Sequence, residues 1–133
     1  MGPKTIAAIM ETAMRIMVVD DSRAMRSIVI RTLRHAGFRD DTFLEAADGA
    51  EALEAITADP PDLVLSDWNM PKLSGIDLLK GLKTAGCDVN FGFVTSECTP
   101  AMREMSVEAG ALFMIAKPFN EDTFREVLEP FIE

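Results

Sequence analysis

The sequence predicts an α/β domain built on a doubly wound, five-stranded parallel sheet with helices on both faces. Strand-like apolar runs alternate five times with helical patterns, and the connections between them are short. The central run, residues 63–65, is continuously apolar, which is typical of a strand buried on both faces of a parallel sheet. A length of 133 residues with 48% hydrophobic content suits one domain with a substantial core.

Five short apolar runs mark the expected strands. They lie at residues 15–19, 42–46, 63–65, 91–95 and 112–116. Turn-forming residues such as Gly, Pro, Asn and Asp separate them from the helical patterns. This regular alternation leaves no room for a second domain or an internal repeat.

Helical spacing of apolar residues fills the intervals between these strands. The expected start signals are Ser22, Ser74, Thr99 and Asn120. The expected stop signals are Gly37, Pro60, Gly86, Gly110 and Pro130. One helix lacks a start signal of this kind, and there we expect Asp48 and Gly49 to form a turn before it.

We expect residues 1–14 to form an N-terminal extension and residues 15–133 to form the domain. Apolar residues of the extension recur at helical spacing, which predicts a short, loosely packed helix. The acidic Glu11 interrupts this run, so it does not fit a secretory signal. Since no apolar run reaches the roughly 20 residues of a membrane span, we expect no membrane insertion.

Composition narrows the functional classes. A formal net charge of -9 and a pI near 4.6 disfavour DNA binding, which needs a basic face. Cys87 and Cys98 lack metal-ligand spacing, so we expect unpaired thiols in a reducing cytoplasm. The single histidine, His35, cannot build a histidine metal site and is expected on a helix surface.

Reactive side chains follow four of the predicted strands. They are Asp20 and Asp21 after the first, Asp67 after the third, Thr95 at the end of the fourth and Lys117 after the fifth. In a flavodoxin-like strand order of 2-1-3-4-5, the first and third strands flank the crevice at the topological switch point. Three carboxylates would therefore converge there.

Carboxylates that converge cannot all remain ionised without compensation. Mg²⁺ provides it, because this ion prefers oxygen ligands and retains bound waters. Lys117 would add one positive charge, and Thr95 would add a hydroxyl group. A carboxylate nucleophile beside a divalent metal, a lysine and a hydroxyl suits an aspartate that accepts a phosphoryl group.

With these residues in view, the chain resembles the receiver domain of two-component response regulators. The resemblance covers about residues 15–132. Within this family, the chain is most similar to stand-alone chemotaxis regulators, which have no output domain. It rests on four motifs in combination: Val18-Val19-Asp20-Asp21-Ser22, Ser66-Asp67-Trp68-Asn69-Met70-Pro71 with Gly75, Val94-Thr95-Ser96 and Lys117-Pro118-Phe119.

The resemblance implies a metal site and a phosphoacceptor. Asp67 is implied to accept the phosphoryl group. Asp21 and Asp67 are implied to bind Mg²⁺ directly through their carboxylates, and Asn69 is implied to bind it through its backbone carbonyl. Asp20 is implied to contact the ion through a water molecule.

The resemblance also implies how the switch works. Lys117 would pair with the phosphoryl group, Thr95 would move to hydrogen-bond it, and the Lys117–Pro118 peptide bond would be cis. Met114 departs from the family, which usually has an aromatic residue three positions before the lysine. The neighbouring Phe113 should face the other side of the strand.

Implied partners are a histidine kinase or histidine phosphotransfer protein upstream and an output protein downstream, with the regulator itself a monomer. Six basic residues lie on or beside the first strand and helix, and Arg23 and Arg26 among them would steer an acidic phosphotransfer partner. The output surface would be the fourth helix, fifth strand and fifth helix, with Met102 and Met105 exposed.

Three other functions are compatible with parts of the pattern. The first is a phosphorelay shuttle or phosphate sink, which uses the same domain. The second is a phosphatase of the haloacid dehalogenase type, but that class needs Asp-x-Asp where this chain has Asp20-Asp21-Ser22. The third is a degenerate receiver that only binds proteins, and the complete set of site residues argues against it.

Overall fold

A computed structural model describes residues 14–39 and 41–128 of the chain. The elements in order are β1 (Arg15–Val19), α2 (Arg23–His35), β2 (Thr42–Ala46), α3 (Gly49–Ala58), β3 (Leu63–Ser66), α4 (Gly75–Thr84), β4 (Asn90–Thr95), α5 (Pro100–Ala109), β5 (Phe113–Ala116) and α6 (Glu121–Leu128). This alternation matches the prediction. The helix expected in the N-terminal extension and the bend expected at Pro130 lie outside the described residues.

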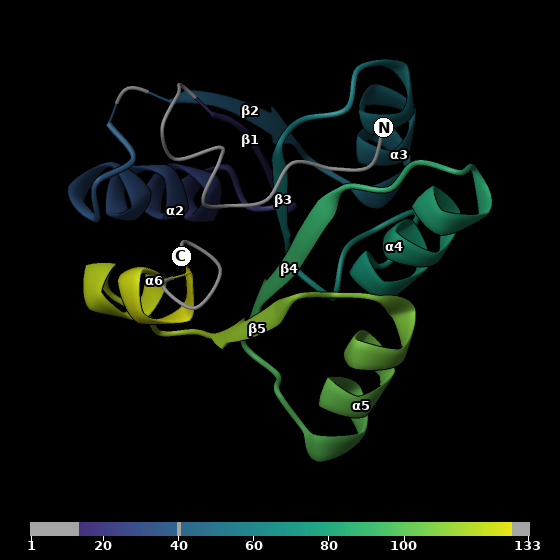
Figure 1. Cartoon of the computed structure of the whole chain (residues 1–133). Coiled ribbons are helices and arrows are strands. Elements are labelled where there is room, and N and C mark those ends of the chain that lie inside the picture. Colours follow the sequence, from purple (N-terminus) through teal and green to yellow (C-terminus); the bar gives the residue numbers. More distant parts are fainter. Residues whose placement is uncertain (1–13, 40, 129–133) are drawn as a thin grey trace.

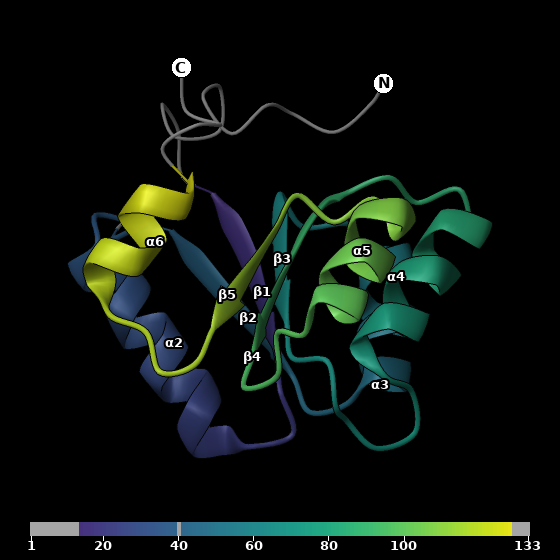
Figure 2. The ribbon, with the colours of Figure 1, turned by 90° about the horizontal axis from the view of Figure 1, so that it is seen from below.

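The five strands form one parallel sheet in the predicted order β2-β1-β3-β4-β5. Helices α2 and α6 cover one face, and α3, α4 and α5 cover the other (Figures 1 and 2). All strands run in the same direction, so their carboxyl ends meet at one edge of the sheet. We call this the carboxyl edge and the opposite side the amino edge.

Strand residues alternate between two apolar clusters because successive side chains point to opposite faces. Ile16 and Val18 of β1 belong to the cluster under α2 and α6. Met17 and Val19 belong to the cluster under α3, α4 and α5. Burial on both faces explains why the central strand reads as a continuous apolar run.

Asp48 has a different role from the one predicted. The sequence was expected to turn at Asp48 and Gly49, whereas Asp48 is the N-cap of α3 and accepts a hydrogen bond from the Glu51 N–H at 2.8 Å. That hydrogen bond, helped by Lys72, lowers the pKa of Asp48 although burial opposes the change. The spacing of the cap to Glu51 is the signal that identifies it.

Strand β5 begins at Phe113, one residue later than predicted. Phe113 packs with the cluster under α2 and α6, and Met114 packs with the opposite cluster. This confirms that the two side chains face opposite sides. Gly92 pairs with Phe113, and a Cβ there would lie 2.1 Å from the Phe113 ring, so only glycine fits beneath it.

Within the described part of the chain, no helix is long and apolar enough to cross a membrane. The two cysteines are free thiols, as expected, and His35 lies exposed near the end of α2.

Candidate functional site

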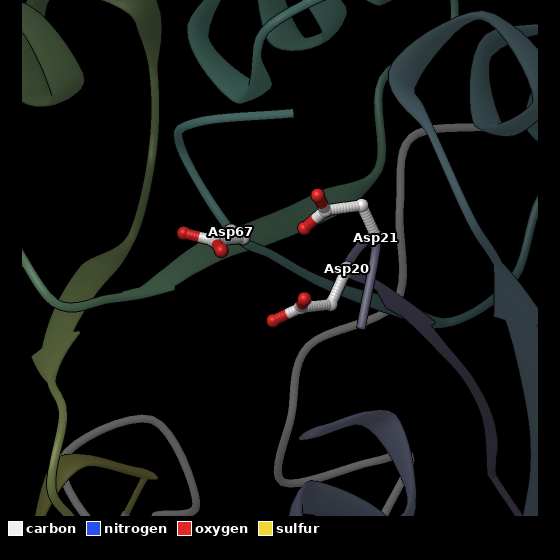
Figure 3. Close-up of side chains that lie close together, drawn as sticks. All are labelled: Asp20, Asp21 and Asp67. Carbon is white, nitrogen blue, oxygen red and sulfur yellow. The ribbon is translucent and has the colours of Figure 1, made fainter. Parts of the chain in front are cut away.

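The carboxyl edge brings three aspartates together. Asp20 and Asp21 follow β1 directly, and Asp67 follows β3, which is paired with β1 in the sheet. One carboxylate oxygen from each lies within 4.8 Å of the others. Figure 3 shows the three side chains around one shared space. Convergence of these residues, which the strand order predicted, is therefore present in the structure.

Asp20 is almost fully buried and is held at several points. Its N–H donates to the Ala46 carbonyl of β2 at 3.2 Å. Its Oδ1 accepts from the Ser22 N–H at 2.9 Å, and its Oδ2 accepts from Lys117 Nζ at 3.0 Å. Because each carboxylate oxygen has a donor, the Asp20 side chain has a fixed orientation.

Asp67 is placed by the backbone on either side of it. Its N–H donates to the Val19 carbonyl at 2.9 Å, and its Oδ1 accepts from the Trp68 N–H at 2.7 Å. A Cβ on Gly75 would lie 2.1 Å from the Asp67 carbonyl oxygen. The glycine at the start of α4 is thus required for the loop to pack beneath the aspartate.

Lys117 is the cation of the site. Its Nζ lies 3.0 Å from Asp20 Oδ2 and 3.3 Å from Asp67 Oδ2. Burial acts to lower the pKa of Lys117, but hydrogen bonds and charge attraction from Asp20 and Asp67 outweigh it and raise the pKa. Lys117 is therefore firmly positive at neutral pH. The peptide bond to Pro118 is cis, as the family resemblance implied.

The charges of this site do not balance. Three carboxylates face one ammonium group, and Asp21 makes no side-chain hydrogen bond to any described residue. Clustered carboxylate oxygens are the donor set that Mg²⁺ prefers, and a divalent ion would offset the excess negative charge. The residues present therefore fit this metal.

Thr95 and Asn69 also lie at the carboxyl edge. Thr95 is the last residue of β4 and is fully buried, and its Oγ1 is 3.5 Å from the Glu97 N–H. Asn69 is exposed two residues after Asp67. The structure gives neither side chain a direct contact with the aspartates, so their roles stay predictions.

Arg26 has contacts that the sequence did not reveal. Of the two arginines predicted to steer a partner, Arg23 is exposed, whereas Arg26 is largely buried against the site. Its Nη1 donates to the Asp20 carbonyl at 2.7 Å, and its Nε donates to Glu45 at 2.9 Å. Sequence spacing alone does not show these contacts, since Arg26 lies on α2 and Glu45 lies on β2, 19 residues further along the chain.

A doubly wound sheet with converging aspartates and a lysine at its carboxyl edge is the arrangement expected of a receiver domain. The family model described as the response regulator receiver domain matches residues 16–129. The chain belongs to this family. Receiver domains bind Mg²⁺ at an acidic pocket, and here the aspartate cluster could hold such an ion.

Within the family, the chain is similar to chemotaxis proteins over nearly its whole length. It is 39% identical to chemotaxis protein CheY-3 of Vibrio cholerae over 95% of this chain and 97% of that protein. It is 37% identical to chemotaxis protein CheY1 of Helicobacter pylori over 87% and 94%. The solved structure of Vibrio cholerae CheY4 superimposes with a TM-score of 0.77 at 30% identity, covering 90% of this chain and 99% of that one.

A relative with a different named function matches almost as well. The chain is 33% identical to sporulation initiation phosphotransferase F of Bacillus subtilis, over 89% of this chain and 93% of that protein. Similarity at this level fits more than one use of the receiver domain.

Proposed function

We propose that this protein is a single-domain response regulator of the chemotaxis type. In this proposal Asp67 accepts a phosphoryl group from a histidine kinase or histidine phosphotransfer protein, and the modification switches binding to an output protein. The observation that carries the proposal is the geometry of the carboxyl edge, where Lys117 Nζ lies 3.0 Å from Asp20 and 3.3 Å from Asp67. The similarity to chemotaxis proteins supports the choice of pathway.

The phosphoryl transfer assigns one role to each residue. A carboxylate oxygen of Asp67 attacks the phosphorus, and the bond from phosphorus to the donor histidine nitrogen breaks. The electron pair stays with the departing imidazole, which takes a proton from water. Lys117 is placed to pair with the transferred oxygens, because its ammonium group already contacts Asp67.

Four residues would hold Mg²⁺: Asp20, Asp21 and Asp67 through their carboxylates and Asn69 through its backbone carbonyl. When bound, the ion supplies positive charge to the transferring phosphoryl oxygens. Asp20 already accepts hydrogen bonds from Ser22 and Lys117. This fits the expectation that it acts through water, while Asp21 has an unengaged carboxylate for direct coordination.

The output side is proposed to be the surface formed by α5, β5 and α6. Met105 is 41% exposed and Val107 is 72% exposed on α5, and Leu112 before β5 is also exposed. Met102, which was expected to be exposed with Met105, instead lies half-buried against the core. The exposed large apolar residues on and just after α5 are therefore Met105, Val107 and Leu112, and Met105 also lines a hollow with Lys80 and Lys83 of α4.

A phosphorelay shuttle is the second candidate. The similarity to sporulation initiation phosphotransferase F favours it. A shuttle would return the phosphoryl group to a second histidine protein, whereas a chemotaxis-type switch would lose it to water while binding its target. We expect the switch, acting as a cytoplasmic monomer and not as a conventional enzyme.

The deciding experiment combines phosphorylation with partner capture. Wild-type protein incubated with a small acyl phosphate and Mg²⁺ should gain the mass of one phosphoryl group, and Asp67→Asn should gain none. Asp62→Asn, at the amino edge, is the matched control and should react like the wild type. If Asp67→Asn is labelled at the wild-type rate, the assignment is wrong. Partner capture with and without beryllofluoride then identifies a target that depends on the modification.

A further inference from the structure

Arg26 connects helix α2 to the backbone of the aspartate cluster. Its Nη1 donates to the Asp20 carbonyl at 2.7 Å, and its Nε donates to Glu45 Oε1 at 2.9 Å. The Arg26 side chain is 13% exposed, so these hydrogen bonds are largely shielded from water. One planar guanidinium group thus joins α2, the loop after β1 and strand β2.

The Asp20 carbonyl belongs to the peptide unit that leads into Asp21. Asp20 has further anchors on its carboxylate, since Ser22 and Lys117 both donate to it. Asp21 has none, because its carboxylate makes no hydrogen bond or ion pair to another described residue. The direction in which Asp21 points therefore depends on its backbone, and Arg26 holds that backbone from one side.

Glu45 fixes the guanidinium group in turn. It lies on β2, next to β1 in the sheet, and accepts from Nε while Nη1 remains directed at the Asp20 carbonyl. The negative charge of Glu45 also offsets the positive charge of Arg26. The contribution of Arg26 to the aspartates is thus geometric more than electrostatic, and lysine cannot reproduce a planar fork of donors.

We infer that Arg26 is a positioning residue for the metal site, which holds the Asp20–Asp21 peptide so that Asp21 faces Asp67, and that Glu45 orients Arg26 for this task. The inference rests on the proposed function and extends it to two residues outside the aspartate cluster. It does not make Arg26 a ligand, since arginine has no lone pair to offer a cation.

The test measures Mg²⁺ affinity by the fluorescence of Trp68, the single tryptophan of the chain. The backbone N–H of Trp68 donates to Asp67 Oδ1 at 2.7 Å, so binding at the aspartates changes the surroundings of this residue. Arg26→Gln should weaken Mg²⁺ binding about tenfold, as is typical for the loss of a residue that orients a ligand. Glu45→Ala, which removes the acceptor that orients Arg26, should weaken Mg²⁺ binding by a smaller factor. Arg31→Gln, an exposed arginine on the same helix, is the charge-matched control and should change it less than twofold.

Two further measurements separate positioning from general stability. Arg26→Lys keeps the positive charge but loses the planar fork of donors. Its Mg²⁺ affinity should stay at least fivefold lower than that of the wild type. At saturating Mg²⁺, Arg26→Gln should react with the small acyl phosphate at nearly the wild-type rate, since Asp67 and Lys117 are untouched. A purely structural role would lower the melting temperature and leave the affinity of the folded protein unchanged.

Several outcomes decide the matter. Equal Mg²⁺ affinity of Arg26→Gln and Arg31→Gln, or full recovery in Arg26→Lys, would overturn this inference alone. Failure of the wild-type protein to bind Mg²⁺ would overturn the proposed function together with it. If Arg26→Gln does not fold, Glu45→Ala, which removes the acceptor of Arg26 Nε, decides in its place, and an unchanged affinity in that variant contradicts the inference.

Discussion

The two edges of the sheet both carry aspartates, but only at one edge does each of the aspartates have a separate hydrogen-bond donor. At the amino edge, Asp41 accepts from the Met14 N–H at 2.8 Å and Asp62 accepts from the Arg15 N–H at 2.9 Å. Asp59 forms an ion pair with the Arg15 guanidinium at 2.9 Å. Each of these carboxylates has a donor of its own and closes a loop onto β1.

At the carboxyl edge, three carboxylates share one lysine, and their oxygens lie within 4.8 Å of one another. Two unit charges at that separation repel by about 3 kcal/mol at an effective dielectric constant of 20. The fold holds this arrangement at a cost in stability that the amino edge does not have. Carboxylates that cluster around one shared cation therefore mark the edge proposed to bind a metal ion, whereas carboxylates with separate donors hold loops to the fold.

The largest difference between the edges should appear in metal binding. Asp21→Ala removes a carboxylate that we propose as a direct ligand, so Mg²⁺ affinity should fall by about 100-fold or more, beyond the loss expected for residues that only orient ligands. Asp62→Ala removes an aspartate of the amino edge and should leave the affinity unchanged. Titration followed by Trp68 fluorescence measures both. A similar loss in the two variants would contradict the distinction between the edges.

The second difference concerns the cations. Lys117→Ala leaves Asp20 and Asp67 without their partner at a site where the lysine is only 15% exposed, and we expect a loss of about 2 kcal/mol in the free energy of unfolding without metal. Arg15→Ala removes a more exposed pair and should cost about 1 kcal/mol or less. Urea unfolding measures both.

Mg²⁺ provides the control for the lysine variant. Lys117→Ala should still bind the ion and recover part of its stability with it, because the ion restores positive charge to the aspartates. It should nevertheless fail to switch partner binding after phosphorylation. If Mg²⁺ binding is lost together with the lysine, the metal site is wrongly assigned.

The sequence predicted the sheet and the aspartate cluster well because both depend on local signals. Continuous apolar runs identify buried strands, and residues that follow such strands meet at one edge whatever the details of packing. Asp20, Asp21, Asp67 and Lys117 could therefore be placed together from strand order alone. The family motifs then supplied the roles.

What the sequence did not show depends on side chains that meet across elements. The hydrogen bonds of Arg26 to Asp20 and Glu45 join a helix, a loop and a strand, and nothing in their spacing predicts them. The burial of Met102 is of the same kind. Both are fixed by the relative placement of elements, which local patterns do not determine, whereas the Asp48 cap had a local signal in its spacing to Glu51.

A smaller effect, opposite in sign at the two edges, should appear in metal-free stability. Asp21→Ala breaks no hydrogen bond within the described chain and removes one repelling charge, so the free energy of unfolding should rise by about 1 kcal/mol, the screened part of the repulsion. Asp62→Ala leaves the Arg15 N–H without its acceptor and should lower it by about 1 kcal/mol. Unfolding in urea with a chelator measures both, and a destabilised Asp21→Ala would refute the claim of stored repulsion.

The smallest expected effect is the signal that leaves the carboxyl edge after phosphorylation. Thr95 should move toward the phosphoryl group, because its hydroxyl can then donate a charge-assisted hydrogen bond. Phe93 lies on the same face of β4, stacks with Trp68 at 4.8 Å between ring centroids, and pairs with Met114 in the sheet. Movement at Thr95 would therefore reach Met114, which takes the place of the family's aromatic residue.

Met114 should relay this movement weakly. It has three flexible torsions and no hydroxyl, so it can fill vacated space in several rotamers without locking either state. We expect the loop at residues 96–100 to carry more of the change. The test compares NMR spectra recorded with and without beryllofluoride. Met114→Ala should retain most chemical-shift changes across residues 99–110, and so should the control variant Met105→Ala. The amide signals of Arg15 and Thr42 at the amino edge should stay unchanged in every protein. Loss of these shift changes in Met114→Ala alone, with Asp67 phosphorylation intact, would make Met114 the essential relay and contradict the prediction.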